Sequence, residues 1–205
     1  MELSSETEIK ILEAATTIFL EKGKDGARME EIAKEAEINQ ALLHYYFRSK
    51  DRLYKEVFNR EVKNVLLDLF TSLDLQKNMH DFFESFISQY MDRLFQHPKT
   101  AGFILWEIRQ GGETAAELLQ DLFTPASTAS PRTVVEKIKK AVEDKEIRTL
   151  DPHHLMMSVI GMCVFTFVAR PMISVIFPEI DFSDSCFIDR RKTEIFNLIW
   201  NGIKP

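Results

Sequence analysis

Residues 28–53 read RMEEIAKEAEINQALLHYYFRSKDRL. Apolar residues in this stretch recur at steps of three and four, a spacing that predicts two short helices over residues 29–36 and 40–47. A turn of three or four residues separates these spans, and Asn39 stands where it can cap the second helix. The arrangement is that of a helix-turn-helix, although an ordinary helical hairpin fits the same spacing.

The charge that follows the turn favours a nucleic-acid partner over a plain hairpin. Residues 40–55 carry four basic side chains and one acidic side chain, a net charge of +3 within a chain of formal net charge −6. A short helix with exposed polar and aromatic residues can enter a DNA groove while neighbouring basic residues bind phosphates. The overall negative charge argues against a protein that coats nucleic acid non-specifically, because such proteins are usually basic.

Helix breakers are scarce in the first half of the chain, and this scarcity predicts an all-α protein. The 205 residues include seven glycines, about half the number expected from average usage, and all seven prolines lie at residue 98 or later. Apolar periodicity predicts about nine helices, and residues 124–131 (TPASTASP) predict a mobile loop. The longer predicted helices cover residues 6–22, 50–70, 80–96, 152–169 and 187–200.

The first predicted helix together with residues 28–53 resembles the DNA-binding domain of the TetR family of bacterial transcriptional repressors. The family's signature has an Ile-Ala pair, a Gly-Val-Ser turn, an aromatic pair, and then a Lys and a Leu. The resemblance covers about a quarter of the chain, and its aromatic and basic end is unusual among helical hairpins. The matching positions are Ile32, Ala33, Leu43, Tyr46, Phe47, Lys50 and Leu53.

Four positions depart from the family's usual residues. Glu37 stands in place of Gly, so the turn must adopt a left-handed or bent conformation without glycine, at a cost of about 1 kcal/mol. Asn39 replaces Ser and can still cap the helix. His44 replaces a common Tyr and Arg28 replaces a common Thr, and either side chain can contact DNA.

The resemblance implies a DNA-binding domain over residues 1–50 and a helical effector-binding and dimerisation domain over residues 51–205. It implies a homodimeric repressor, not an enzyme, that binds a palindromic double-stranded operator and is released by a small hydrophobic effector. No cofactor or metal is expected. The residues expected at the DNA are Arg28, Asn39, Gln40, Ala41, His44, Tyr45, Arg48 and Lys50.

Apolar residues in the larger domain suggest an effector pocket and a dimer interface. The resemblance implies a pocket for a small molecule, and aromatic and Met residues are the candidates for it, although such residues at helical spacing form a plain core more often than a ligand cavity. The last two long helices are more apolar than a monomer surface tolerates, which predicts a four-helix interface between two copies. The expected pocket residues are Phe86, Tyr90, Phe103, Trp106, Met157 and Phe165, and the expected interface residues are Ile160, Val164, Ile195, Leu198 and Ile199.

Other classes of protein are less well supported by the residues. The uncharged stretch 155–169 is shorter than the roughly 20 residues of a membrane span, so a buried helix or an interface is the better interpretation. Two cysteines without CxxC spacing, Cys163 and Cys186, predict reduced core thiols and a cytoplasmic protein. Motifs typical of nucleotide, zinc, di-iron or serine-nucleophile sites are absent from the sequence. The alternative function is a helical carrier of a hydrophobic ligand, or an enzyme, without DNA binding.

Overall fold

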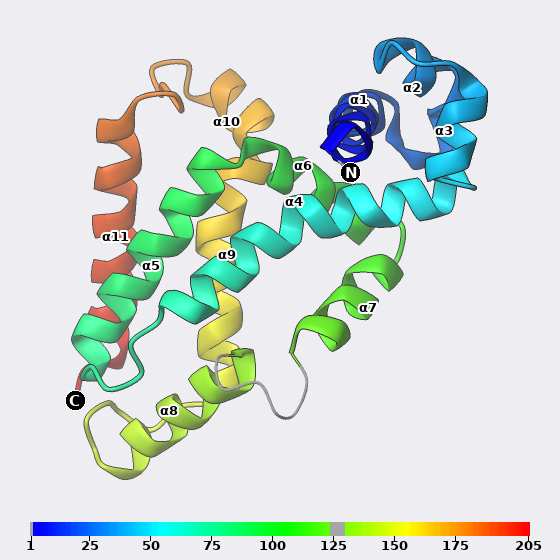
Figure 1. Cartoon of the computed structure of the whole chain (residues 1–205). Coiled ribbons are helices and arrows are strands. Elements are labelled where there is room, and N and C mark those ends of the chain that lie inside the picture. The colour runs from blue at the N-terminus through cyan, green and yellow to red at the C-terminus, as the bar shows by residue number, and fades with distance from the viewer. Residues whose placement is uncertain (1, 124–129) are drawn as a thin grey trace. The chain divides into compact units, whose positions relative to one another are not determined.

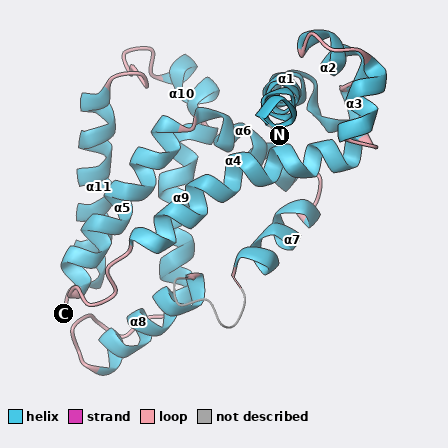
Figure 2. Ribbon diagram, in the orientation of Figure 1, coloured by secondary structure: helices cyan, strands magenta, loops and turns pink. Residues whose placement is uncertain are grey.

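The computed structural model describes residues 2–123 and 130–205, and every regular element in those ranges is a helix (Figure 1 and Figure 2). The prediction of an all-α protein is therefore confirmed. Most of the loop predicted to be mobile, residues 124–129, lies outside the described residues. The helices are α1 (Glu2–Gly26), α2 (Met29–Glu35), α3 (Gln40–Tyr46), α4 (Lys50–Ser72), α5 (Met79–Gln96), α6 (Pro98–Arg109), α7 (Glu113–Leu122), α8 (Pro131–Glu143), α9 (Pro152–Val168), α10 (Arg170–Ile176) and α11 (Ser185–Ile203).

The described residues form eleven helices, whereas the sequence predicts about nine. The short helix α10 has no counterpart among the predicted helices, because Arg170 and Pro171 place a charge and a helix breaker directly after the uncharged stretch. Pro171 instead lies in the first turn of α10, where a helix loses no hydrogen bond to the missing N–H. The first helix also begins at Glu2, ahead of the predicted start at residue 6.

The chain divides into two compact units. The first unit consists of residues 1–64 and 102–118, and the second consists of residues 65–101 and 119–205. Besides the predicted domain 1–50, the first unit thus contains the beginning of α4 and parts of α6 and α7. The helix-turn-helix does not form a unit by itself.

The core of the first unit is built around the ring of Tyr54, on α4. The ring centroid lies 5.2 Å from that of Phe19, 6.1 Å from that of Phe103 and 4.8 Å from that of Trp106. Phe58, one turn further along α4, lies 6.2 Å from Tyr54 and is also buried. Helices α1, α4 and α6 therefore meet at a single aromatic cluster.

The end of α1 is shaped by Gly23. The backbone leaves helical geometry at this residue, with φ 68° and ψ 172°, close to the predicted helix end at Lys22 and Gly23. A Cβ atom at this position would lie 2.5 Å from Nε1 of Trp106, well inside the normal contact distance. Both the positive φ and the close approach of the indole require glycine here.

Residues of α5 form the centre of the second unit. Helices α9 and α11 both pack against α5, and Figure 1 shows α11 alongside it. Because α5 has neighbours on more than one side, its buried surface exceeds a single stripe. The buried residues of α5 are Met79, Phe82, Phe83, Phe86, Ile87, Tyr90, Met91 and Leu94.

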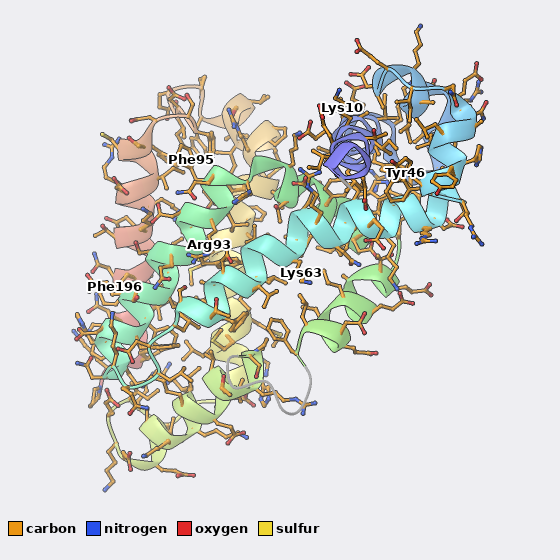
Figure 3. All side chains as sticks on the ribbon, viewed as in Figure 1. Lys10, Tyr46, Lys63, Arg93, Phe95 and Phe196 are labelled. Carbon is orange, nitrogen blue, oxygen red and sulfur yellow. The ribbon has the colours of Figure 1, made fainter. Side chains whose placement is uncertain are left out.

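Polar side chains join the elements around this core. Arg93 Nη2 donates to the carbonyl oxygen of Asp68 at 2.9 Å and to the hydroxyl of Ser72 at 3.1 Å, which attaches α5 to the last part of α4 (Figure 3). Lys137 Nζ donates to the carbonyl oxygens of Leu75 and Lys77 and so holds α8 against the α4–α5 connection. The two bonds from Lys137 satisfy backbone carbonyls of a connection that lies outside the helices.

Helix α9 is uncharged but only partly enclosed. Its buried positions include Cys163, whereas Cys186 on α11 is exposed, so the prediction of a core thiol is wrong for Cys186. Among the described helices, none is by itself long and apolar enough to cross a membrane. Helices α9 and α10 have the required length and apolar composition only when they are taken together, and the pair is bent by 70° at the junction.

Replacing Gly23 with Ala is expected to destabilise the chain by about 2 kcal/mol, because the new Cβ meets the Trp106 indole and the backbone conformation is strained for an L-residue. Thermal unfolding followed by circular dichroism measures this change. Gly202→Ala is the matched control, since nothing lies within 4 Å of a Cβ at that helical position. A Gly23→Ala melting temperature equal to that of the control would contradict the tight contact.

Candidate nucleic-acid interface

The turn between α2 and α3 has the geometry that its sequence predicts. Glu37 has φ 56°, in the left-handed region, so the chain makes the bend without glycine. The N–H of Glu37 donates to the carbonyl oxygen of Lys34 at 3.1 Å, and the N–H of Ile38 donates to that of Ala33 at 3.0 Å. This pair of bonds is a Schellman motif, which ends α2 and redirects the chain into α3.

Helix α3 presents one side to the core and the other to solvent. Asn39 Oδ1 accepts from the N–H of Leu42 at 2.7 Å and so caps the helix, as expected. Leu43 is fully buried, and Phe47 directly after the helix is 3% exposed. Tyr45 points outward with 80% of its surface exposed. The other predicted base-facing residues, Gln40, Ala41 and His44, are exposed as well.

The predicted phosphate-binding residues have different surroundings. Arg28 and Arg48 are exposed, on either side of the helix-turn-helix. Lys50 is half-buried, and its Nζ donates to the carbonyl oxygens of Asp25 at 3.1 Å and Ala27 at 3.2 Å. Because these bonds occupy two of its three N–H groups, Lys50 anchors the start of α4 to the end of α1 and the α1–α2 connection, and it retains one donor.

An acidic residue near this surface is neutralised by an ion pair. Asp51 Oδ1 lies 2.9 Å from Nζ of Lys24, and this hydrogen-bonded contact holds the pKa of the Asp51 carboxyl below its usual value. The Lys24 ammonium also lies 5.5 Å from the ring centroid of Tyr54. The negative charge closest in sequence to Arg48 and Lys50 is therefore compensated within the chain.

Two residues at the start of α4, Ser49 and Arg52, are not among the DNA-contacting residues predicted from the sequence. Ser49 Oγ accepts from the N–H of Arg52 at 3.2 Å and caps α4. Arg52 itself is exposed in the first turn of α4. Its contribution to the local charge of +3 was the signal that could have placed it among the basic residues of the site.

Family models match both parts of the chain. A model described as bacterial regulatory proteins, tetR family, matches residues 11–57. A model described as the C-terminal domain of the HTH-type transcriptional dual regulator CecR matches residues 75–203, more than half of the chain. The chain belongs to the TetR family.

Individual relatives agree with this membership. The HTH-type transcriptional repressor SCO4008 of Streptomyces coelicolor is 32% identical over 101 residues, 49% of this chain and 49% of the repressor. The biofilm operon negative transcriptional regulator IcaR of Staphylococcus aureus is 45% identical over 47 residues, 23% of this chain and 25% of IcaR. The matched part of the chain thus spans about half the length of the first relative and a quarter of the second.

A solved structure shares the fold along almost the entire chain. It is that of a Clostridium perfringens protein described as a fatty acid metabolism regulator, with a TM-score of 0.73. The alignment covers 96% of this chain and 99% of that chain at 19% sequence identity. At this identity the likeness extends to the fold alone.

The residues predicted for the effector pocket of this TetR-family chain have unlike environments. Phe86 and Tyr90 are buried in the second unit, with ring centroids 6.0 Å apart. Met157 and Phe165, also in the second unit, are 59% and 55% exposed, so their surroundings differ from those of the two buried rings. The remaining two, Phe103 and Trp106, belong to the first unit and pack against Tyr54.

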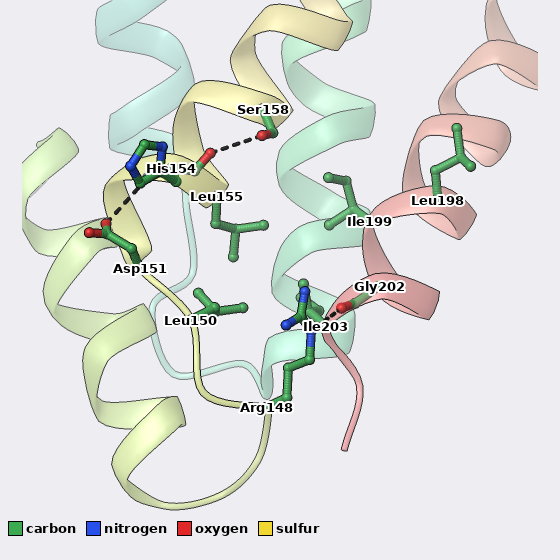
Figure 4. A pocket seen from close by; sticks show the side chains of 10 residues that line it. All are labelled: Arg148, Leu150, Asp151, His154, Leu155, Ser158, Leu198, Ile199, Gly202 and Ile203. Atoms are coloured by element: carbon green, nitrogen blue, oxygen red, sulfur yellow. Dashed lines mark hydrogen bonds between the residues drawn. The ribbon is translucent and has the colours of Figure 1, made fainter.

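Two surface cavities in the second unit contain none of these six residues. One has a volume of about 280 Å³ and lies between the start of α9 and the end of α11 (Figure 4). The other has a volume of about 550 Å³ and lies along the start of α11. The first is lined by Arg148, Leu150, Asp151, His154, Leu155, Ser158, Leu198, Ile199, Gly202 and Ile203.

The residues predicted for the dimer interface separate into two groups. Ile195 and Ile199 are 0% and 7% exposed and belong to the core of the second unit. Both side chains pack within their own chain, and their part in an interface between two copies stays a prediction. Leu198 and Ile160 are 62% and 39% exposed, and Val164 is half-buried.

Two histidines on the surface, His80 and His153, have side-chain partners. His153 Nδ1 lies 3.2 Å from Oδ1 of Asp151, which caps α9 by accepting from the following N–H groups. Among the described residues, His80 lies with Asp81 and Glu84 in an exposed group whose potential ligand atoms are within 4.8 Å of one another. The His80 ring packs edge-on against two aromatic rings of α11, which accounts for its position.

Replacing Glu37 with Gly is expected to stabilise the chain by up to about 1 kcal/mol, because glycine adopts φ 56° without strain. Chemical unfolding monitored by circular dichroism measures the gain. Lys145→Gly is the matched comparison in the second unit, since Lys145 has φ 59°. A loss of stability in Glu37→Gly would show that the Glu37 side chain contributes more than its backbone strain removes.

Proposed function

We propose that this TetR-family protein is a transcriptional repressor that binds a palindromic operator as a homodimer. The observation that carries the proposal is the division of α3 into a fully buried Leu43 and an exposed face that includes Tyr45. A helix held from behind by a core can enter the major groove as a rigid body. A DNA partner of this kind agrees with the predicted cytoplasmic location.

The exposed face of α3 supplies the groups that base recognition needs. The Gln40 amide can donate and accept at a base edge, His44 can do the same through its ring nitrogens, and the Tyr45 ring offers an apolar surface and a hydroxyl. Arg28 and Arg48 would bind phosphates on either side of the groove, with Arg52 and the remaining donor of Lys50 beside them. Basic groups that flank a recognition helix set its register on the duplex.

Homodimerisation is supported by apolar side chains that the single chain leaves uncovered. Leu198 on α11 and Ile160 on α9 are large and exposed, and both helices have a second face in the core. Two copies that meet through these outer faces would form a symmetric bundle of four helices. Two-fold symmetry would then present two α3 helices to half-sites about one helical turn apart.

A small apolar effector is the remaining part of the proposal. Its support is the resemblance to ligand-released repressors and the abundance of aromatic residues in the second unit. An effector acts by preferring the conformation that does not fit the operator. Native mass spectrometry of the purified chain would detect an apolar molecule that is bound to it.

The decisive experiment is selection of bound duplexes from a random DNA pool. A palindromic consensus is expected, because two copies of α3 related by two-fold symmetry read the same sequence in opposite directions. Recovery of no consensus, together with binding that does not change with salt, would favour the alternative of a carrier or an enzyme without DNA binding.

Tyr45→Ala is expected to weaken binding to the selected operator at least about tenfold, because each subunit loses a base contact. Arg48→Gln is expected to weaken binding to all duplexes and to lower the salt dependence by about two released counterions per dimer. Fluorescence anisotropy over a range of salt concentrations measures both effects. Lys139→Gln, which removes an exposed charge from α8, is the control, and a loss equal to that of Arg48→Gln would refute the assigned face.

Leu198→Asp is expected to yield a folded monomer, because it places a charge on the exposed face proposed to meet the second copy. Analytical ultracentrifugation measures the mass, and circular dichroism verifies the helix content. Asn197→Asp, on an exposed neighbouring position, introduces the same carboxylate as a control. Dimers of undiminished stability in Leu198→Asp would exclude this interface.

A further inference from the structure

Glu107 is an acidic residue enclosed in the first unit, with 4% of its surface exposed. Its Oε1 atom accepts from the N–H groups of Thr114 at 2.7 Å and Ala115 at 3.3 Å. Its Oε2 atom accepts from the hydroxyl of Tyr54 at 3.1 Å. Carboxylates are almost never this deeply buried without partners, and here three donors surround one carboxyl group.

The first two of these bonds hold the beginning of α7. The N–H groups in the first turn of a helix have no partner within the helix, and a carboxylate is the acceptor best suited to them. Glu107 lies near the end of α6 and reaches across the α6–α7 turn, where the N–H of Gly112 also donates to its carbonyl oxygen at 2.9 Å. One side chain therefore fixes how α7 starts relative to α6.

The third bond extends this link to α4. Burial, followed by the charge of Glu107, raises the pKa of Tyr54, so the phenol remains protonated and able to donate. Tyr54 is one turn beyond Lys50, which is bonded to one carbonyl oxygen at the end of α1 and to one in the α1–α2 connection. The start of α4 is thus held from both sides, by the α1–α2 connection and by Glu107.

The orientation of α4 determines that of the recognition helix, α3. Only residues 47–49 separate α3 from α4. Leu43 and Leu53 are fully buried, and Phe47 between the helices is 3% exposed. A connection this short, with its side chains packed in the core, cannot absorb a rotation of α4, so α3 would follow it.

We propose that Glu107 is a positioning residue for DNA recognition, which acts through Tyr54 to hold α4, and with it α3, in the orientation that fits the operator. The inference rests on the proposed function and deepens it. Glu107 touches no DNA in this assignment. Its effect on affinity comes from the geometry of the surface formed by α3.

The test compares three variants for binding to the duplex selected by the wild-type protein. Tyr54→Phe removes only the hydroxyl. Glu107→Gln keeps one oxygen for the amides of α7, but its NH2 group can meet Tyr54 only as an uncharged donor, so the charge-assisted bond from the phenol is lost. Each is expected to weaken operator binding about fivefold, and the double variant is expected to lose no more than either one. Glu107→Ala leaves all three donors without an acceptor and is expected to lose more than Glu107→Gln.

Affinity is measured by anisotropy at a temperature where circular dichroism shows every variant fully folded and dimer mass is unchanged. Ile138→Val is the control, since it removes one methyl group from the core of the second unit and lowers stability without touching Glu107. Its operator affinity is expected to match that of the wild type. A stability defect alone would lower the melting temperature of the variants but leave their affinity at that of this control.

Two results would overturn the inference. Wild-type affinity in folded Tyr54→Phe and Glu107→Gln would show that the link does not position α3. Losses that multiply in the double variant would show that the two groups act separately. If the wild-type protein selects no DNA, the proposed function fails and this inference fails with it, whereas unaffected variants beside a binding wild type refute the inference alone.

Discussion

The burial of Tyr54 is the interaction on which the first unit, with its helix-turn-helix, depends. Its ring joins α1, α4 and α6 in one aromatic cluster, and its hydroxyl donates to Glu107. Burying an aromatic ring of this size contributes a few kcal/mol, but only if the hydroxyl finds a partner in the same place. The apolar core and the hydrogen bond from Tyr54 to Glu107 must therefore form together. Residues 102–118 are for this reason part of the same unit as the helix-turn-helix.

Charge is distributed so that a chain with a net charge of −6 can carry a basic surface. Arg28, Arg48 and Arg52 are exposed around the helix-turn-helix. Asp51, the acid nearest in sequence to Arg48 and Arg52, is paired with Lys24. An acidic remainder of the molecule would disfavour indiscriminate binding to DNA, while the local field favours contact through one face.

Local features of the site could be predicted from the sequence, because each depends on neighbours within a few residues. The left-handed Glu37 and the Asn39 cap follow from turn and capping geometry. Ile195 and Ile199 could not be distinguished from Leu198 in this way. All three are apolar residues on the same helix, and only the positions of α5 and α9, which pack against it, decide which of them is enclosed.

By itself, the sequence determined the all-helical fold, the spans of α2 and α3, and the face of α3 that points outward, because hydrophobic periodicity and capping act over one or two turns. Tertiary structure alone decided that Lys50 anchors α4, that Met157 and Phe165 are exposed, and that Glu107 joins three helices. A buried acid gives no signal in a sequence. Its three donors lie far apart in the sequence, since Tyr54 and Ala115 are separated by 61 residues. Only folding brings them to one carboxylate.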